Sequence, residues 1–193
     1  DSSVAPETLK ALVDGYQSHE TLKIGELWAL PTLLRFVLIE NLRRLAMRVN
    51  RGRIMRQVAN EIADKLALAE AHETPEPDLG AYADHARDAT FATQFLYRLR
   101  DGSRVAGNAL SWLEKELERH DTNAEAIIAA EHQALSSGNV TVGNIIRGLR
   151  RIDDQDWSAW FEEVSQVDTL LRRAGNYAEL DFQSRDQYRT AIE

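Results

Sequence analysis

The sequence has no cysteine among its 193 residues. Disulfide bonds, thiolate metal sites and cysteine nucleophiles are therefore excluded. Lysine is also scarce, since only four of the 23 basic residues are lysine and the rest are arginine. The net charge is -8. We therefore expect no general affinity for nucleic acid, because a phosphate backbone attracts a basic surface.

Long hydrophobic runs are missing as well. No apolar run reaches the roughly 18–20 residues that a membrane-spanning helix needs. The best candidate, residues 24–42, is interrupted by a proline and several charged residues. No signal-peptide pattern is present. The chain starts at Asp1 and stops at Glu193 inside a helical pattern, so we expect it to be a piece of a larger protein.

The alternation of apolar and polar residues that is typical of strands is limited to one triplet, residues 140–142. Apolar residues instead recur at spacings of three and four, which indicates helices with one buried face. The sequence predicts an all-α fold, a multi-helix array of about eight to ten helices around a long leucine-rich central helix.

The central helix is expected at residues 25–46. Its leucines form one line along a single face: Leu27, Leu30, Leu34, Leu38, Leu42 and Leu45. Phe36, Val37 and Ile39 widen that line, so we expect much of the circumference to be buried. Pro31 lacks an N–H and should kink the helix or start a fresh one. Beyond Val49 the pattern resumes, and we favour a continuous or gently bent helix across Gly52.

Composition divides the chain into three parts. Residues 1–71 form a long-helix N-terminal part. Residues 72–80 form an acidic linker with two prolines, and such a segment breaks regular structure. Residues 81–193 form a bundle of shorter helices, although one continuous domain over the whole chain is an alternative.

Helix ends in the third part follow from capping patterns. We expect a turn at 101–103, a capping box at 122–125 that opens a helix, and a stop at 137–139. Thr141 should cap the next helix.

Further along, Asp153 and Asp154 should cap a helix that carries Trp157, Trp160 and Phe161 on its inner side. This helix should extend through Leu171 and end by Gly175, and a last helix should start at about Gln183.

We find no pattern that marks a catalytic or metal-ligating residue. The histidines lack ligand spacing, and neither a phosphate-binding glycine loop nor a nucleophile elbow occurs. An acid–base pair among the many carboxylates remains an alternative. The spacing of Trp157, Trp160 and Phe161 is typical of a core, and a sugar-stacking platform is the alternative.

Six arginines within fourteen residues form what we call the Arg43–Arg56 group: Arg43, Arg44, Arg48, Arg51, Arg53 and Arg56. One interpretation is a solvated helix face that pairs with acidic neighbours such as Glu40, Glu61 and Asp64. The other is a contact surface for anionic lipid headgroups or for an acidic partner domain. Nucleic acid is not expected, because no aromatic residues interleave the group.

A second set of polar residues lies near the end of the chain. Asp181 can cap a helix on which Arg185 and Arg189 share one face, with Asp186 and Tyr188 beside them. These residues form either a capping and salt-bridge network that fixes the last helix or a docking surface for another module.

Three segments together resemble a known family. They are Ile24–Pro31 with Leu38–Ala46, then Glu131-His132 followed by Val140–Arg150, and finally Tyr177–Arg189. In this order they are similar to the N-terminal region of bacterial cyclic β-1,2-glucan synthases, and the resemblance covers nearly the whole chain.

The resemblance implies a parent protein of the bacterial inner membrane that transfers glucose from UDP-glucose, with a divalent metal, to make a cyclic osmoregulated periplasmic glucan. The transferase motifs of the family do not occur in this chain, so no catalytic residue and no cofactor is assigned to it. The implied role is a non-catalytic helical structural or interaction domain on the cytoplasmic side. It would position the glycosyltransferase module, with the downstream modules of the same polypeptide as partners.

Two other functions stay open. One is a module that binds glucan or nucleotide sugar. The other is a free-standing helical adaptor that uses the Arg43–Arg56 group.

Overall fold

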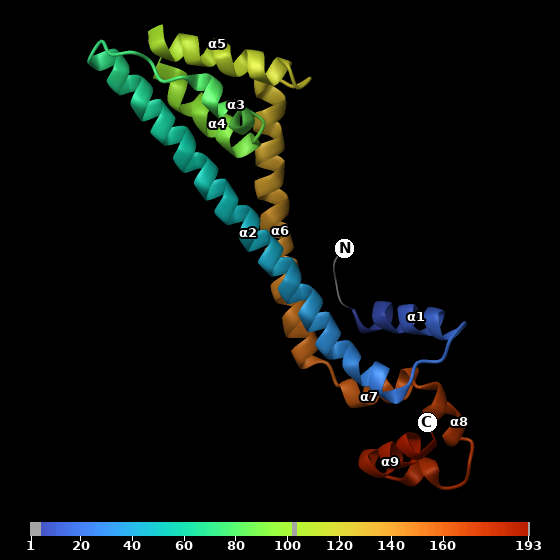
Figure 1. Ribbon diagram of the computed structural model, residues 1–193. Coiled ribbons are helices and arrows are strands. Elements are labelled where there is room, and N and C mark those ends of the chain that lie inside the picture. Colours follow the sequence, from blue (N-terminus) through green and yellow to red (C-terminus); the bar gives the residue numbers. More distant parts are fainter. Residues whose placement is uncertain (1–4, 102–103, 193) are drawn as a thin grey trace. The chain divides into compact units, whose positions relative to one another are not determined.

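The computed structural model describes residues 5–101 and 104–192. Within them the chain forms nine α-helices and no strand, which confirms the all-α prediction (Figure 1). Gly102 and Ser103 of the expected turn lie outside the described residues.

The α-helices are α1 (Pro6–Gln17), α2 (Ile24–Ala71), α3 (Ala83–Ala86), α4 (Ala89–Arg98), α5 (Arg104–Glu118), α6 (Ala124–Asp154), α7 (Trp157–Val164), α8 (Gln166–Leu171) and α9 (Phe182–Ile192). Three short 3-10 helices, η1 (Leu79–Tyr82), η2 (Leu99–Asp101) and η3 (Tyr177–Glu179), join some of them.

The chain divides into two compact units. Unit 1 contains residues 1–42 and 142–193, and unit 2 contains residues 43–141. The helices α2 and α6 contribute residues to both units. The 72–80 segment lies inside unit 2, and the division of the chain into domains at that segment stays a prediction.

Helix α2 has 48 residues and contains both Pro31 and Gly52. No second helix starts at Pro31, and the expected continuity across Gly52 is confirmed. A proline inside a helix removes one backbone hydrogen bond. Burial of Pro31 itself and of its neighbours Leu27 and Leu38 offsets that loss.

In unit 1, α1, α7 and the first turns of α2 share one apolar core. Trp28 of α2 stacks on Phe161 of α7 with ring centroids 4.9 Å apart. The buried members are Leu9, Val13, Ile24, Leu27, Trp160, Phe161 and Val164. A smaller cluster holds α2 against α6 through Leu38, Ile145 and Ile152. Gly148 permits this approach, because a Cβ there would lie 3.0 Å from Cδ1 of Leu38.

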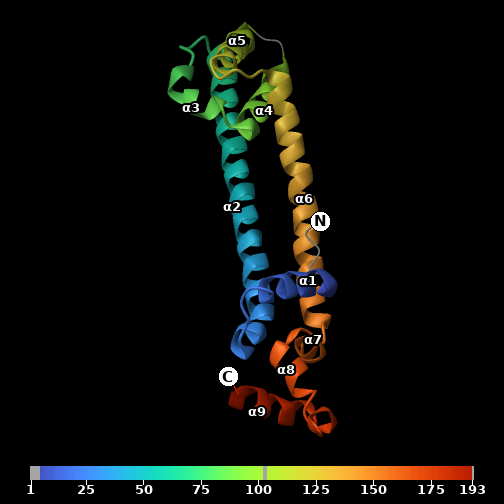
Figure 2. The same cartoon turned by 90° about the vertical axis from the view of Figure 1, so that its right-hand side faces the viewer.

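Unit 2 has a larger apolar core, to which α2, α3, α4, α5 and α6 all contribute. In both views α4 and α5 lie beside the unit 2 portions of α2 and α6 (Figure 2). The most deeply buried side chains include Ala59, Ile62, Phe91, Phe95, Ala109, Leu113 and Leu117. The rings of Phe91 and Phe95 stack with centroids 5.5 Å apart.

The expectation that much of the circumference of the central helix is buried is wrong. Leu27 and Leu38 are buried as predicted, but Phe36, Val37 and Ile39 are each more than half exposed. Within unit 1, α1 and α7 pack against the first turns of α2 and α6 packs against the side that faces Ile145 and Ile152, which leaves Phe36, Val37 and Ile39 largely uncovered. An apolar pattern shows that a face can be buried, but not which element covers it.

The predicted helix stop at 137–139 is also wrong, because α6 runs unbroken through Gly138. Thr141 does not cap a new helix. Its hydroxyl donates to the Ser137 carbonyl one turn back, at 2.8 Å, as threonine does inside helices. At the start of α6, the side chain of Asn123 rather than Thr122 acts as the cap, accepting from the Ala126 N–H at 2.9 Å.

Asp153 and Asp154 end α6 instead of capping the next helix. Asp156 caps α7 by accepting from the Ala159 N–H at 3.0 Å. The helix expected from Trp157 through Leu171 is divided in two at Ser165, because that residue is extended and its hydroxyl caps α8.

Candidate interaction surfaces

A buried ionic cluster joins α7, α8 and α9 in unit 1, and we call it the C-terminal ionic cluster. At its centre Nη1 of Arg189 lies 2.7 Å from Oδ1 of Asp168, and neither side chain is exposed. Arg172 reaches the other oxygen of Asp168 through its Nε at 2.5 Å. Glu162 of α7 contacts Nε of Arg185 at 2.7 Å and Nη1 of Arg189 at 3.3 Å. Each buried charge therefore has an opposite charge in contact, as burial requires.

Local structure places these groups. The cap at Ser165 starts α8 and sets Asp168 three residues later at its inner side. The guanidinium of Arg189 lies 5.0 Å from the ring centroids of both Phe161 and Phe182. Aromatic faces attract a cation, so this apolar surrounding still favours the arginine.

The cluster shifts the pKa values of several of its groups, among them Asp168 and Tyr177. Burial alone would raise the pKa of the Asp168 carboxyl, but hydrogen bonds from Tyr177, Arg172 and Arg189 outweigh it and hold that pKa below its ordinary value. Burial and the hydrogen bond to Asp168 raise the pKa of Tyr177 to about 12. The Tyr177 hydroxyl donates to Oδ1 of Asp168 at 2.7 Å. Asp168 thus stays a carboxylate and Tyr177 a neutral phenol near neutral pH.

The structure brings the predicted C-terminal residues close to this cluster. The carboxylate of Asp181 accepts from the Ser184 N–H at 2.8 Å, so it caps α9 as predicted. Asp186 contacts Arg189 at 3.2 Å. The Tyr188 ring is exposed and lies edge-on to Tyr177, with centroids 6.3 Å apart. A docking role for these residues stays a prediction, and Arg189 itself is fully buried.

Sequence reasoning missed Glu162, Asp168 and Tyr177 as partners in the cluster. One signal was available, because Asp168 precedes Arg172 by four residues, the spacing of a helical ion pair. The burial of Asp168 and its contact with Arg189 depend on how three helices pack, which no local spacing shows.

The Arg43–Arg56 group lies on the unit 2 part of α2 and is mostly exposed. Arg51 contacts Asp88 at 3.3 Å, and Arg56 contacts Glu131 at 3.2 Å. These partners are not the acidic neighbours expected from the sequence, because they come from the α4 cap and from α6. Arg43 donates to Sδ of Met47 at 2.8 Å, and the side chains of Arg44, Arg48 and Arg53 are exposed.

A second surface is apolar and belongs to unit 1. We call it the α2 outer face: Leu33, Phe36, Val37 and Ile39, which are 53–67% exposed. Leu34 and Leu38 pack inward, Phe36 lies on the opposite side of the helix, and Leu33 and Val37 lie between these two sides. Large apolar side chains gathered on one surface indicate a contact site more often than scattered ones do.

The third surface is a groove in unit 2, which we call the α4–α6 groove. One wall is formed from α4 and η2, the other from α6, and Leu110 of α5 contributes to the lining. Its volume is about 520 Å³, which lies in the range of ligand-binding clefts, roughly 300–1,000 Å³.

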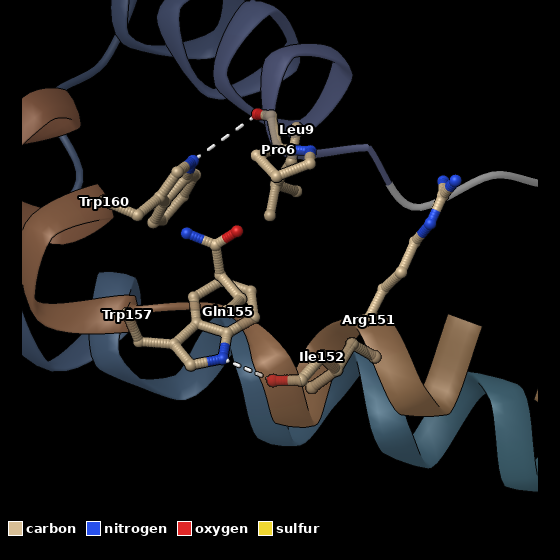
Figure 3. A pocket seen from close by; sticks show the side chains of 7 residues that line it. All are labelled: Pro6, Leu9, Arg151, Ile152, Gln155, Trp157 and Trp160. Atoms are coloured by element: carbon tan, nitrogen blue, oxygen red, sulfur yellow. Dashed lines mark hydrogen bonds between the residues drawn. The ribbon is translucent and has the colours of Figure 1, made fainter. Parts of the chain in front are cut away.

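The tryptophans do not form an open platform. Figure 3 shows the indole nitrogens of Trp160 and Trp157 pointing to the carbonyls of Pro6 and Ile152, at 3.4 Å and 2.8 Å. The hollow beside them has a volume of only about 10 Å³, room for no more than about one water molecule. Trp160 and Phe161 are buried, as the packing interpretation predicts.

The described residues contain neither a metal-binding group nor a membrane-spanning helix. No group of three histidine, aspartate or glutamate side chains in that part of the chain could hold a metal ion. Among the same residues, no helix is both long enough and apolar enough to cross a membrane.

The fold and these surfaces define an all-α region with exposed apolar and basic surfaces and a buried ionic cluster. A region of this kind is found in a known class of protein. Over 192 residues, which is 100% of this chain, it is 54% identical to the cyclic beta-(1,2)-glucan synthase NdvB of Rhizobium meliloti (strain 1021). The resemblance to the N-terminal region of such synthases is confirmed.

The chain spans only 7% of the length of that relative. No protein-family model matches the chain. The match therefore relates this chain to one region of a glucan synthase. It does not assign the activity of the whole relative to this chain.

Proposed function

We propose that this chain is a non-catalytic interaction domain of a cyclic β-1,2-glucan synthase and that it positions the glycosyltransferase module of the same polypeptide. The observation that carries the proposal is the 54% identity to NdvB over the full length of the chain. At that identity over a whole chain, the two regions share a fold and its packing.

The α2 outer face supports an interaction role. Phe36 is 67% exposed, and Leu33 and Val37 lie beside it on the same side of α2. Exposing such side chains to water is unfavourable, at roughly 1.5–3 kcal/mol for each fully exposed residue relative to burial. Contact with another module would recover part of that free energy.

The same proposal includes the setting of the parent protein. We propose an inner-membrane synthase that uses UDP-glucose and a divalent metal in its transferase module, with this region on the cytoplasmic side. Within this chain we assign neither donor nor metal ligand.

The test is made in the full-length synthase that contains this chain. The double substitution of Phe36→Ser and Val37→Ser removes apolar contacts from the outer face without touching the inner one. We expect glucan yield to fall several-fold while the amount of synthase in the membrane fraction changes little. Leu170→Ser is the matched control, because Leu170 of α8 is 61% exposed and lies off this face.

An in-frame deletion of residues 1–193 gives the broader result. Loss of glucan synthesis, or a change in glucan size, supports a positioning role. Unchanged yield, size and membrane assembly after the deletion would contradict the proposal.

The exposed arginines support a second proposed partner, an anionic membrane surface. Arg48 and Arg53 project from the unit 2 part of α2, and each basic residue near an anionic surface contributes about 1 kcal/mol. Sedimentation of the chain with phosphatidylglycerol vesicles tests it, and binding should fall with added salt and with Arg48→Glu. Equal binding to uncharged phosphatidylcholine vesicles would contradict an electrostatic contact.

A further inference from the structure

Two rows of side chains form the walls of the α4–α6 groove of unit 2. The first row contains Thr93, Leu96 and, at the adjoining 3-10 helix, Arg100. These residues are three or four apart and therefore share one helix face. The second row is on α6, where Ala124, Ile128 and His132 follow a spacing of four.

The two rows run in opposite directions. The hydroxyl of Thr90, in the first turn of α4, donates to Oε2 of Glu131 at 2.9 Å. The start of α4 therefore lies beside the His132 end of the α6 row. Since Ala124 lines the same groove, it lies toward the other end, with Arg100. The groove thus has a histidine at one end and an arginine at the other.

The length of the groove follows from helix geometry. From Thr93 to Arg100 is seven residue steps, which at 1.5 Å per residue is about 10 Å, or two helical turns. The centre of each wall is apolar, with Leu96 in one row and Ile128 in the other. Two apolar side chains one turn apart on another helix match this length.

Two polar features of the groove bear on what it could bind. Oγ1 of Thr93 is buried and has no hydrogen-bond partner in the described part of the structure. A buried hydroxyl without a partner costs free energy, so each such group needs an explanation. The groove lining also contains no carboxylate, although the chain as a whole has a net charge of -8. An occupant with an acidic group would complement Arg100.

We propose that the α4–α6 groove binds one amphipathic helix that carries two apolar residues one turn apart and a carboxylate that pairs with Arg100. This helix belongs to another part of the same synthase polypeptide, an assignment that rests on the proposed function. A helix matches the groove better than a single-headed lipid does, because polar groups stand at both ends of a two-turn apolar channel. When that helix binds, the Thr93 hydroxyl turns from its buried position toward the groove and donates to a backbone carbonyl or polar side chain of the helix.

Photo-cross-linking in the full-length synthase tests the inference. Tyr97 lines the groove, is 67% exposed, and is replaced by the photoreactive p-benzoylphenylalanine, which preserves an aromatic ring. The matched control carries the same group at Leu68, which is 57% exposed on the unit 2 part of α2. Mass spectrometry then identifies the cross-linked peptide.

We expect position 97, but not position 68, to cross-link to one peptide outside residues 1–193 that has helical apolar spacing and a nearby acidic residue. Arg100→Glu should reduce this yield at least five-fold, whereas Arg100→Lys should retain most of it. A yield at position 97 no higher than at position 68 overturns the inference. Cross-links only to lipid or to a second copy of this chain overturn it as well.

The isolated chain provides a second measurement. Thr93→Val removes the unpaired hydroxyl and should raise the melting temperature of the isolated chain, while the same substitution lowers the cross-linking yield in the synthase. A lower melting temperature would mean that the hydroxyl already has a partner within the chain, and would count against the inference.

The outcomes separate this inference from the proposed function. If deletion of residues 1–193 abolishes glucan synthesis and position 97 gives no specific cross-link, only the groove inference fails. If the deletion has no effect, the positioning role fails whatever the cross-links show.

Discussion

Unit 2 buries two phenylalanines and several leucines at its centre, whereas the centre of α7–α9 in unit 1 is an arginine bonded to an aspartate. The first arrangement gains free energy from removing apolar surface from water. The second has to offset the cost of dehydrating two charges, and does so only while every partner is in place. The two units should therefore respond differently to the same perturbation.

The difference follows from the lengths of the helices. In unit 2, α5 and long portions of α2 and α6 offer wide apolar faces to one another. In unit 1, α7, α8 and α9 have 8, 6 and 11 residues. Helix α7 contributes to the apolar core of unit 1, but α8 and α9 bury little apolar area, so hydrogen-bonded charges fix their orientation against α7 instead. Such a network of hydrogen-bonded charges favours one arrangement of the helices, but substitution of any one member weakens it.

The largest effect is expected from breaking the ionic pair. Arg189→Met leaves the Asp168 carboxylate buried without its main partner, and should destabilise unit 1 by about 3–5 kcal/mol. Amide hydrogen exchange should show lost protection in α8 and α9 but not in α4 and α5. Arg173→Met is the control, because Arg173 is exposed. Equal exchange in both variants would mean that the cluster contributes little.

The apolar core of unit 2 can be tested in a similar way. Leu113 is fully buried between the helices of that unit, and Leu113→Ala should cost about 2–5 kcal/mol through lost burial and the cavity left behind. Urea unfolding measures the change. Leu68→Ala, at an exposed site in the same unit, should cost far less. In Leu113→Ala, amide hydrogen exchange should increase in α4 and α5 but not in α8 and α9, the reverse of the pattern expected for Arg189→Met.

The two units should also differ in their response to pH. The pKa of Asp168 is lowered in the folded chain, so as pH falls the unfolded chain takes up this proton first. The stabilisation from Asp168 is present above its ordinary pKa of 3.8 and is lost as pH falls through the lowered folded value. The pKa of Tyr177 is raised to about 12, so its stabilisation is lost as pH rises from 10 toward that value.

Hydrogen exchange at neutral pH and at pH values below about 4, where carboxylates take up protons, measures this contrast. Protection in α8 and α9 should fall before protection in α4 and α5 as the solution is acidified. If α4 and α5 lose protection first, the distinction between an ionic and an apolar centre does not govern acid stability.

The sequence was sufficient for the features that depend on local spacing. The all-α fold, the continuous helix across Gly52 and the cap at Asp181 each follow from residues within a few turns of one another. The inward positions of Trp160 and Phe161 follow from their spacing in the same way. Local patterns contain this information because a helix face is defined over four to eight residues.

Other features depend on which helices meet and were not predictable in this way. The outward side of Phe36 and Val37 looks as apolar in the sequence as the inward side of Leu34 and Leu38, and only the packing of α6 distinguishes them. The α4–α6 groove and the burial of Asp168 likewise arise from contacts between distant segments. Both depend on packing that is absent from local spacing.

The smallest expected effect concerns Gly138, where the sequence suggested a helix stop and the structure has the interior of α6. A Cβ at this position would lie 3.6 Å from Cδ1 of Leu45, an ordinary contact. Gly138→Ala should therefore stabilise unit 2 by roughly 0.5–1 kcal/mol, because alanine loses less backbone entropy in a helix. Thermal unfolding measures the shift, with Gly175→Ala as the contrast. Gly175 has φ +53, so alanine there should destabilise unit 1. A destabilising Gly138→Ala would mean that α6 bends or ends at this residue in solution.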